Sequence, residues 1–244
     1  MKNIKYLAIV TLLALSLASC DKETEGLTDI TYYPVITLEG GDVLMGLGEN
    51  YVDPDYTADL GGEDVTSQVV VTDNIDNSSI GVYQVSYTVT NSYGFSSTVT
   101  RNVIVYDPTV NVYIGGTYET DMNATLYGTA GRTFAEYAAA YGNTDQCVGI
   151  TWTEIAPGFY YINDLFGGWY EQIRAYGARY AMTAYVSVDN DYNIELLDSY
   201  IAGWGDSVDY IDGGIFDPET GTINYFVSYA GQIFMDIVLN RVSE

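Results

Sequence analysis

Apolar and polar residues alternate over short stretches along most of this chain. This period of two is typical of β-strands that bury one face. On one face the alternating positions are Tyr83, Val85, Tyr87 and Val89, and after a turn at residues 91–94 they are Val99, Arg101, Val103 and Val105. The pattern predicts a hairpin, and the neighbouring stretches between residues 31 and 106 extend it to a β-sandwich of about seven strands.

The alternation continues beyond residue 109, and two further stretches show it clearly: Met182, Ala184, Val186 and Val188, then Ile233, Met235, Ile237 and Leu239. Turn residues follow at 189–191 and precede the last strands at 217–221. The Ala-rich segment from Arg132 to Tyr141 fits a helix or a strand, and we interpret it as a strand. The sequence therefore predicts a second antiparallel domain over residues 109–244, a β-barrel or a curled sandwich, with Asp107-Pro108 at the boundary.

The first twenty residues have a different pattern. Lys2 and Lys5 flank the start of an almost wholly apolar run, residues 6–17, and the sequence Leu-Ala-Ser-Cys then ends at Cys20. This order is that of a secretory signal, and the run is too short to span a bilayer permanently. The ending resembles the bacterial lipobox, which implies that residues 1–19 are a lipoprotein signal peptide and that Cys20 is lipidated. The alternative is an ordinary cleaved signal in which Cys20 is incidental.

Residues 20–30 are polar and acidic, and we interpret them as a tether. An acid-rich tether that contains a lysine, here Lys22, resembles the export signal of Bacteroidetes lipoproteins that face the cell exterior; a plain solvated linker is the alternative. The resemblance implies a protein on the outer membrane, facing outward. The lipid is then its expected membrane anchor.

Charge excludes several function classes. The chain has 33 acidic and 8 basic residues, a formal net charge of −25, and such a surface repels nucleic acid. It has no histidine, which removes Ser-His-Asp and Cys-His catalysis and histidine zinc sites. With Cys20 lipidated, Cys147 has no disulfide partner and is expected to be buried. We expect no metal and no cofactor.

Motifs between residues 31 and 106 resemble a known module. Gly81-x-Tyr83-x-Val85 is similar to the tyrosine corner of Ig-like folds. The other motifs, in order, are Pro34-x-Ile36-x-Leu38, Tyr51-x-Asp53-Pro54-x-Tyr56, Asp64-Val65-Thr66 and Arg101-x-Val103-x-Val105. Together they resemble bacterial Ig-like domains related to the hyalin repeat. The resemblance implies an Ig-like β-sandwich that acts as a spacer or adhesion module without enzymatic activity.

The second domain carries motifs of its own: residues 160–170 with Asp164-Leu165-Phe166-Gly167-Gly168-Trp169-Tyr170, then Tyr176-Gly177, Gly203-Trp204-Gly205-Asp206-Ser207 and Phe216-Asp217-Pro218. These resemble the C-terminal β domain of unknown function in Bacteroidetes surface lipoproteins, which often follows the Ig-like module. The genes of those proteins tend to lie beside outer-membrane glycan importers. The resemblance implies fold and location, and names an importer complex as a partner.

Aromatic residues interleaved with Gly and charged residues are the clearest functional signal. A sugar offers an apolar C–H face and a rim of hydroxyls, so a binder combines flat rings with polar groups. The candidate ligand-binding residues are Trp169, Tyr170, Arg174, Tyr176, Trp204 and Asp206. The alternative for each ring is a place in the core. Arg174 and Arg179 lie close together in sequence and suit an anionic sugar, although we expect them to neutralise neighbouring carboxylates.

Other candidate sites are weaker. Asp189-x-Asp191-x-Asn193 begins like an EF-hand loop but has Ile194 where Gly is required, so we interpret it as a hairpin turn. The acids Asp53, Asp55, Asp59, Glu63 and Asp64 are interpreted as a solvated loop rather than a calcium site. Two carboxylates suffice for a glycoside hydrolase, but a chain this acidic always offers a pair.

The sequence thus predicts an all-β, lipid-anchored, non-catalytic protein that binds a polysaccharide or oligosaccharide in support of its uptake. The alternatives are a structural or adhesion lipoprotein with a protein partner and, less favoured, a glycoside hydrolase.

Overall fold

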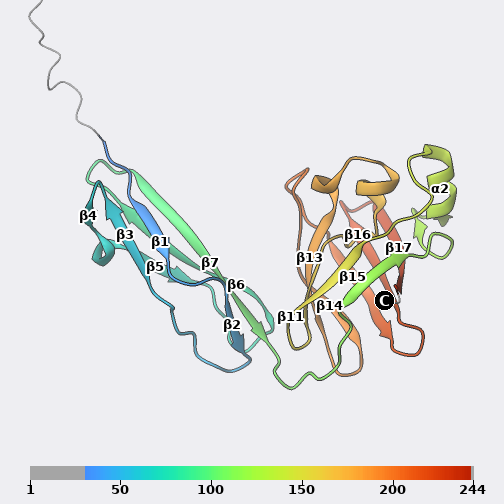
Figure 1. The fold of residues 1–244 in the computed structure, drawn as a ribbon, viewed down its shortest axis with the longest axis horizontal. Coiled ribbons are helices and arrows are strands. Elements are labelled where there is room, and N and C mark those ends of the chain that lie inside the picture. Colours follow the sequence, from blue (N-terminus) through green and yellow to red (C-terminus); the bar gives the residue numbers. More distant parts are fainter. Residues whose placement is uncertain (1–30, 243–244) are drawn as a thin grey trace, which may run out of the picture.

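The computed structural model describes residues 31–242. The expected signal peptide, Cys20 and the whole tether of residues 20–30 lie outside these residues. The described chain forms two β-rich bodies, one built from residues 35–106 and one from residues 116–241 (Figure 1). In the described part of the chain, no helix combines the length and the apolar character needed to cross a bilayer.

The N-terminal body is a sandwich of two sheets. One sheet has the order β1-β3-β4 (Val35–Leu38, Tyr56–Leu60 and Glu63–Asp64), and the other has the order β2-β7-β6-β5 (Val43–Gly46, Ser96–Tyr106, Gly81–Thr90 and Val70–Asp73). The short 3₁₀ helix η1 (Thr66–Gln68) precedes β5. β2 runs parallel to β7, and the other pairs are antiparallel. The predicted Ig-like sandwich is confirmed.

The hairpin predicted from alternation is β6 and β7. Val85, Tyr87 and Val89 point from β6 into the core, where they meet Val103 and Val105 of β7. The tyrosine corner is also present: the Tyr83 hydroxyl donates a hydrogen bond of 3.0 Å to the carbonyl of Ser79, four residues upstream.

The C-terminal body is an antiparallel barrel. Its strands are β8 (Gly116–Thr120), β11 (Ile150–Ala156), β12 (Phe159–Ile162), β13 (Met182–Val188), β14 (Asn193–Ile201), β15 (Tyr210–Asp217), β16 (Thr222–Tyr229) and β17 (Ile233–Arg241). Each pairs with the next, and β17 pairs with β8 to close the ring. Closure leaves the barrel without free edge strands and surrounds a core rich in aromatic rings.

One prediction for this domain is wrong. The segment from Arg132 to Tyr141 is a two-residue strand, β10 (Arg132–Thr133), followed by a helix, α2 (Phe134–Tyr141). Thr133 and Glu136 form a capping box: the Thr133 hydroxyl accepts from the Glu136 amide, and the Glu136 carboxylate accepts from the Thr133 amide. Gly142, in the left-handed conformation with φ 71°, ends the helix. The local signals for a helix therefore outweigh the strand interpretation.

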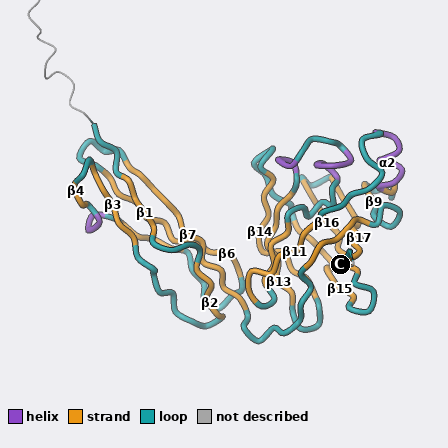
Figure 2. Tube along the Cα trace, viewed as in Figure 1, coloured by secondary structure: helices purple, strands orange, loops and turns teal. Residues whose placement is uncertain are grey.

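Helical turns gather at one end of the barrel (Figure 2). These are α2, a π-helical turn η2 (Trp169–Ile173) and a 3₁₀ turn η3 (Ala178–Tyr180), with β9 (Leu126–Tyr127) pairing β10 and β17 nearby. The tight turn at residues 189–192 between β13 and β14 matches the predicted hairpin turn. Cys147 is buried, as expected.

The two bodies touch through a small apolar contact. Phe159 and Ala156, from the β11–β12 hairpin of the barrel, pack with Ile104 of β7. Half-buried side chains surround this contact from both sides, including Val82 from the sandwich and Tyr185 from the barrel. The contact lies where the two bodies converge in Figure 1.

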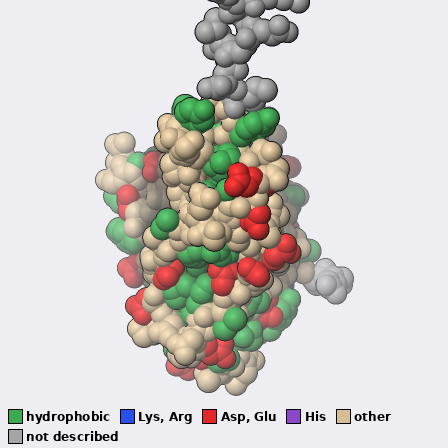
Figure 3. Space-filling model, turned by 90° about the vertical axis from the view of Figure 1, so that its left-hand side faces the viewer, with side chains coloured by type: hydrophobic (Ala, Val, Ile, Leu, Met, Phe, Trp, Pro, Cys, Tyr) green, Lys and Arg blue, Asp and Glu red, His purple; other side chains and the backbone are tan. Residues whose placement is uncertain are grey.

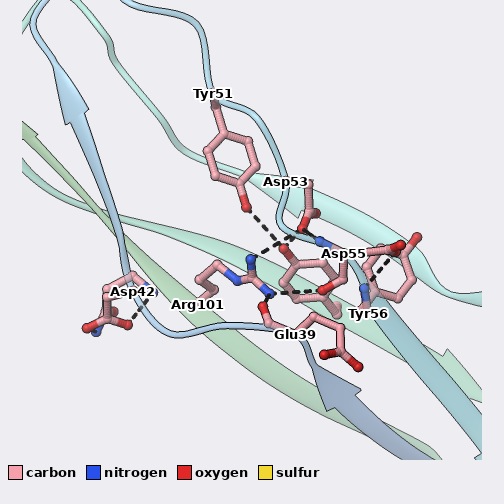
Figure 4. Close-up of polar contacts among 9 residues, drawn as sticks. Glu39, Asp42, Tyr51, Asp53, Asp55, Tyr56 and Arg101 are labelled. Atoms are coloured by element: carbon pink, nitrogen blue, oxygen red, sulfur yellow. Dashed lines mark hydrogen bonds and ion pairs between the residues drawn. The ribbon is translucent and has the colours of Figure 1, made fainter.

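A buried arginine joins the two sheets of the sandwich (Figure 4). Arg101 on β7 is 2% exposed, and its Nη2 donates to the carbonyl oxygens of Glu39 at 2.8 Å and Asp55 at 3.0 Å. Glu39 follows β1 and Asp55 precedes β3, so the guanidinium fastens both strands of the opposite sheet. Its Nη1 lies 3.4 Å from the Asp53 carboxylate, which also accepts a 2.7 Å hydrogen bond from the Tyr87 hydroxyl.

This arginine is the only basic residue between residues 31 and 106. The face of the molecule drawn in Figure 3 accordingly shows carboxylates and hydrophobic side chains but no Lys or Arg. Asp53, one of the acids considered for calcium, is instead the partner of Arg101.

We predict that Arg101→Ala lowers the free energy of unfolding of the sandwich by about 3–5 kcal/mol, because it removes a buried cation together with three contacts and leaves Asp53 unpaired. Hydrogen-exchange mass spectrometry is the measurement, since it resolves the two bodies. Peptides from residues 35–106 should exchange faster, whereas those from the barrel should not change. Thr100→Ala, at an exposed site on the same strand, is the control. Unaltered exchange in Arg101→Ala would refute the role of the arginine.

Candidate functional site

Exposed aromatic rings gather at the end of the barrel that carries the helical turns. Tyr141 ends α2, Tyr176 follows η2, and Trp204 lies in the loop between β14 and β15; their exposed fractions are 43%, 43% and 45%. Tyr141 and Tyr176 are linked through Arg174, and Tyr176 and Trp204 have ring centroids 6.3 Å apart. We call Tyr141, Arg174, Tyr176 and Trp204 the aromatic patch.

Trp204 is held firmly although nearly half of it is exposed. Its ring meets Tyr170 at 4.7 Å and Tyr180 at 4.9 Å edge-on, and it lies nearly parallel to Tyr229 at 6.3 Å. Gly203 permits this approach, because a Cβ at that position would come within 2.4 Å of the Tyr180 ring. A large ring fixed in this way loses little conformational entropy when a ligand covers its free side.

Two charged side chains lie near Trp204: Arg174, which contacts Tyr176, and Asp206, which is two residues further along the chain. Arg174 places its guanidinium carbon 4.7 Å from the centroid of Tyr141 and 5.2 Å from that of Tyr176, and its Nη2 donates to the Tyr176 hydroxyl at 2.7 Å. Asp206 is exposed two residues after Trp204 and accepts a 3.3 Å hydrogen bond from the Tyr229 hydroxyl. Burial and the Asp206 carboxylate raise the pKa of Tyr229 to about 12, so this hydroxyl remains a donor at neutral pH.

The turn that carries Tyr170, Arg174 and Tyr176 is anchored by a buried acid. Asp164 lies immediately after β12, and its carboxyl oxygens accept hydrogen bonds from the amides of Phe166 (3.0 Å), Gly168 (3.0 Å) and Met182 (3.2 Å). These bonds tie both ends of the segment between β12 and β13 to one side chain. Burial raises the pKa of Asp164 to about 7, although the three amides favour its charged form.

The structure separates the six candidate residues into two groups. Arg174, Tyr176, Trp204 and Asp206 come together at the surface. Trp169 is 0% exposed, with Tyr127 stacked on it at 4.0 Å, and is therefore a core residue without a free face for a ligand. Tyr170 is 6% exposed and supports Trp204 from below.

The contacts of Arg174 and Arg179 differ from the expected pairing with neighbouring carboxylates. Among the described residues the ion pair within 4.0 Å is Arg101–Asp53, in the sandwich. The expectation that Arg174 and Arg179 neutralise neighbouring carboxylates is therefore wrong. Arg174 instead stacks on rings, and Arg179 lies with its Nη2 3.4 Å from the carbonyl of Ala202.

Sequence reasoning missed Tyr141. Its position follows from α2, which brings Tyr137 and Tyr141, four residues apart, to one side of the helix, where their rings stack at 6.3 Å. The signal was the capping box at Thr133 and Glu136, which marks a helix start. Tyr180 and Tyr229, which brace Trp204, carry no local signal because their approach depends on barrel closure.

The Cys147 thiol and the acidic side chains bear on nucleophilic catalysis and on metal binding. Burial raises the pKa of the Cys147 thiol to about 12, so the thiolate that nucleophilic catalysis needs is not formed near neutral pH. Within residues 31–242 no group of three or more Cys, Asp or Glu side chains has a geometry that holds a metal ion.

Comparison with known proteins identifies relatives for both bodies. Residues 36–105 match the family described as bacterial surface protein, Ig-like domain, and residues 107–241 match a family of C-terminal domains. The crystal structure of the lipoprotein BT2262 from Bacteroides thetaiotaomicron is 32% identical, with a TM-score of 0.47; the match covers 86% of this chain and all of that one. No curated protein matches.

Two structures from Clostridium perfringens ZmpB are more distant. One contains the M60 catalytic domain with CBM51-1 and CBM51-2 (14% identity, TM-score 0.27, covering 85% of this chain and 21% of that one). The other contains CBM51-2 in complex with GlcNAc and INT domains (16% identity, TM-score 0.26, covering 86% and 44%). At these scores neither likeness carries a functional argument.

We predict that Asp164 makes the barrel less stable as pH rises. The folded protein holds the proton up to about pH 7, whereas the unfolded chain releases it near the ordinary value of 3.8. Protonation therefore favours folding between these values, and the free energy of unfolding should fall on the order of 3–4 kcal/mol from this group across that window. Urea unfolding followed by tryptophan fluorescence measures it, since all three Trp lie in the barrel.

Asp164→Asn separates this effect from other titrations. The Asn amide nitrogen cannot accept an N–H, so the variant should be about 1–3 kcal/mol less stable than wild type at pH 5. This difference should shrink toward pH 8, because only the wild type loses its proton. Asp191→Asn, in an exposed turn, should show no such trend. A difference that stays constant from pH 5 to pH 8 would mean that Asp164 is already ionised in the folded protein, with the three amides outweighing burial.

Proposed function

This chain belongs to the bacterial surface-lipoprotein family represented by BT2262 of Bacteroides thetaiotaomicron, and from that premise we propose that it captures glycans at the cell surface without cleaving them. Lipidation of Cys20 attaches it to the outer membrane, with the sandwich as spacer and the barrel as the binding domain. Its ligand is a polysaccharide or oligosaccharide that a neighbouring importer then takes up.

The observation that carries the proposal is the exposed, braced ring of Trp204. A pyranose presents an apolar C–H face that stacks on a flat ring, and its hydroxyls need hydrogen-bond partners at the ring edge. Trp204 supplies the ring, Asp206 supplies an acceptor two residues later, and Arg174, which reaches Trp204 through Tyr176, supplies a donor. Soluble proteins otherwise rarely leave several large rings together in water.

The arrangement favours binding over catalysis. Glycoside hydrolysis needs two carboxyl groups that face each other across the sugar. Asp206 is an exposed carboxylate beside the patch. Asp164, the acid with a raised pKa at this end of the barrel, is buried, and its oxygens accept from three amides, so it is not available to a sugar as the second member of a pair.

We predict that Trp204→Ala weakens glycan binding roughly 5- to 30-fold, which corresponds to the loss of about 1–2 kcal/mol of stacking. Affinity gel electrophoresis and isothermal titration against a panel of soluble polysaccharides measure it. Trp204→Phe should retain part of the affinity. Tyr210→Ala removes an equally exposed ring (49%) outside the patch and should change nothing.

The wild type must be retarded by at least one polysaccharide for the proposal to stand. If Trp204→Ala is retarded as strongly as the wild type, the glycan binds at a site other than the aromatic patch. Release of reducing ends would replace capture with hydrolysis. Co-purification with an outer-membrane protein in the absence of any glycan affinity would favour a structural role.

A further inference from the structure

We propose that the glycan bound at the aromatic patch is acidic, bearing carboxylate or sulfate groups that Arg174 and Arg132 contact. This inference rests on the proposed function and specifies its ligand. It starts from an observation in the barrel: although the chain has 33 acidic residues, Arg132 and Arg174 form no ion pair within 4.0 Å among the described residues and lie over tyrosine rings.

The rings and guanidinium groups form one continuous series, the ladder. Arg132 lies 4.3 Å from the centroid of Tyr137, whose ring stacks on Tyr141 at 6.3 Å. Arg174 lies between Tyr141 and Tyr176, and Tyr176 meets Trp204 edge-on. The order along the ladder is Arg132, Tyr137, Tyr141, Arg174, Tyr176 and Trp204. Cations and aromatic rings thus alternate along the ladder.

The planar guanidinium group of Arg174 can offer N–H donors to a ligand along its edge. Its central carbon lies over Tyr141 and Tyr176, and the five N–H donors of the group all lie in its plane. One of them donates to the Tyr176 hydroxyl, and that bond fixes the plane of the group. A carboxylate or a sulfate fits such an edge with two parallel hydrogen bonds, a geometry that a single sugar hydroxyl cannot match.

A neutral glycan would bind this surface less well. Covering Arg174 and Arg132 removes water from two charged groups, and the cost is recovered only when a partner of opposite charge or full hydrogen bonding replaces it. An acidic sugar provides that partner where a neutral one does not. If a carboxylate of the chain paired with these arginines, it would occupy the N–H groups that an acidic ligand needs.

The net charge of −25 opposes the approach of an anion only at a distance. At physiological salt the Debye length is about 8 Å, so charges elsewhere on the molecule are largely screened at the ladder. Groups in direct contact then decide the affinity. Two arginines of the barrel lie outside the ladder: Arg179, near the carbonyl of Ala202, and Arg241, which donates to the Tyr118 hydroxyl and the carbonyl of Gly115.

Matched polysaccharides test the inference. The full chain is titrated with polygalacturonate and its methyl ester, and with chondroitin sulfate and its desulfated form, so that backbone shape is constant while charge changes. We expect the charged member of at least one pair to bind about 10-fold or more tightly than its neutral or less charged partner, with an affinity that falls as salt is raised.

Arginine variants locate the contact. Arg174→Gln should lower affinity for the charged member about 10-fold or more and abolish the preference within the pair, and Arg174→Lys should restore only part of it, because Lys keeps the charge without the planar edge. Arg179→Gln changes the net charge equally but removes no ring contact, and it should retain the preference.

The outcomes distinguish this inference from the proposed function. Equal binding of charged and neutral members, with loss on Trp204→Ala, overturns the acidic ligand and leaves glycan capture intact. If Arg174→Gln and Arg179→Gln reduce the preference for the charged glycan equally, that preference arises from net charge, and the role of the ladder is overturned. Binding of no polysaccharide in either pair or in the wider panel overturns both.

Discussion

The surface of the barrel depends on one buried carboxyl group. Asp164 receives three backbone amides from the segment between β12 and β13, which holds that segment in a π-helical turn rather than a longer helix or an open loop. Tyr170 lies on this turn, and Arg174 and Tyr176 follow it directly. The strands form the closed barrel, but the segment around η2 determines which side chains at this end are buried and which are exposed. The buried Asp164 carboxyl group therefore influences which side chains lie on the surface.

The two bodies place charge in their interiors in opposite ways. Arg101 in the sandwich has an acid, two carbonyl groups and an aromatic ring around it, and it joins two sheets. Asp164 has only neutral amides, and burial without a cation is why its pKa is raised. Asp164 therefore lies within the range where a proton can be lost near neutral pH. The barrel should respond to acidity through this group.

Alternation predicted the strands well because a pleated strand with one buried face leaves a period of two in the sequence. It could not rank Trp169 against Trp204, since both lie among glycines and polar residues, and only barrel closure puts one in the core and the other at the surface. The helix α2 was missed because alanine runs suit both states, although the capping box gave a local signal. The meeting of residues 141, 174 and 204 has no local signal at all, because three separate loops of a closed barrel bring them together.

The two bodies diverge from their contact at Ile104, Ala156 and Phe159, so the end of the sandwich where β1 begins and the helical turns of the barrel lie toward the same side of the molecule (Figure 1). A protein tethered through its N-terminus would then not raise its ligand away from the bilayer as a straight stalk would. It would bend back, and a captured chain would lie in the space between the arms and the membrane. That geometry would keep a ligand bound at the aromatic patch on the same side of the molecule as the tether.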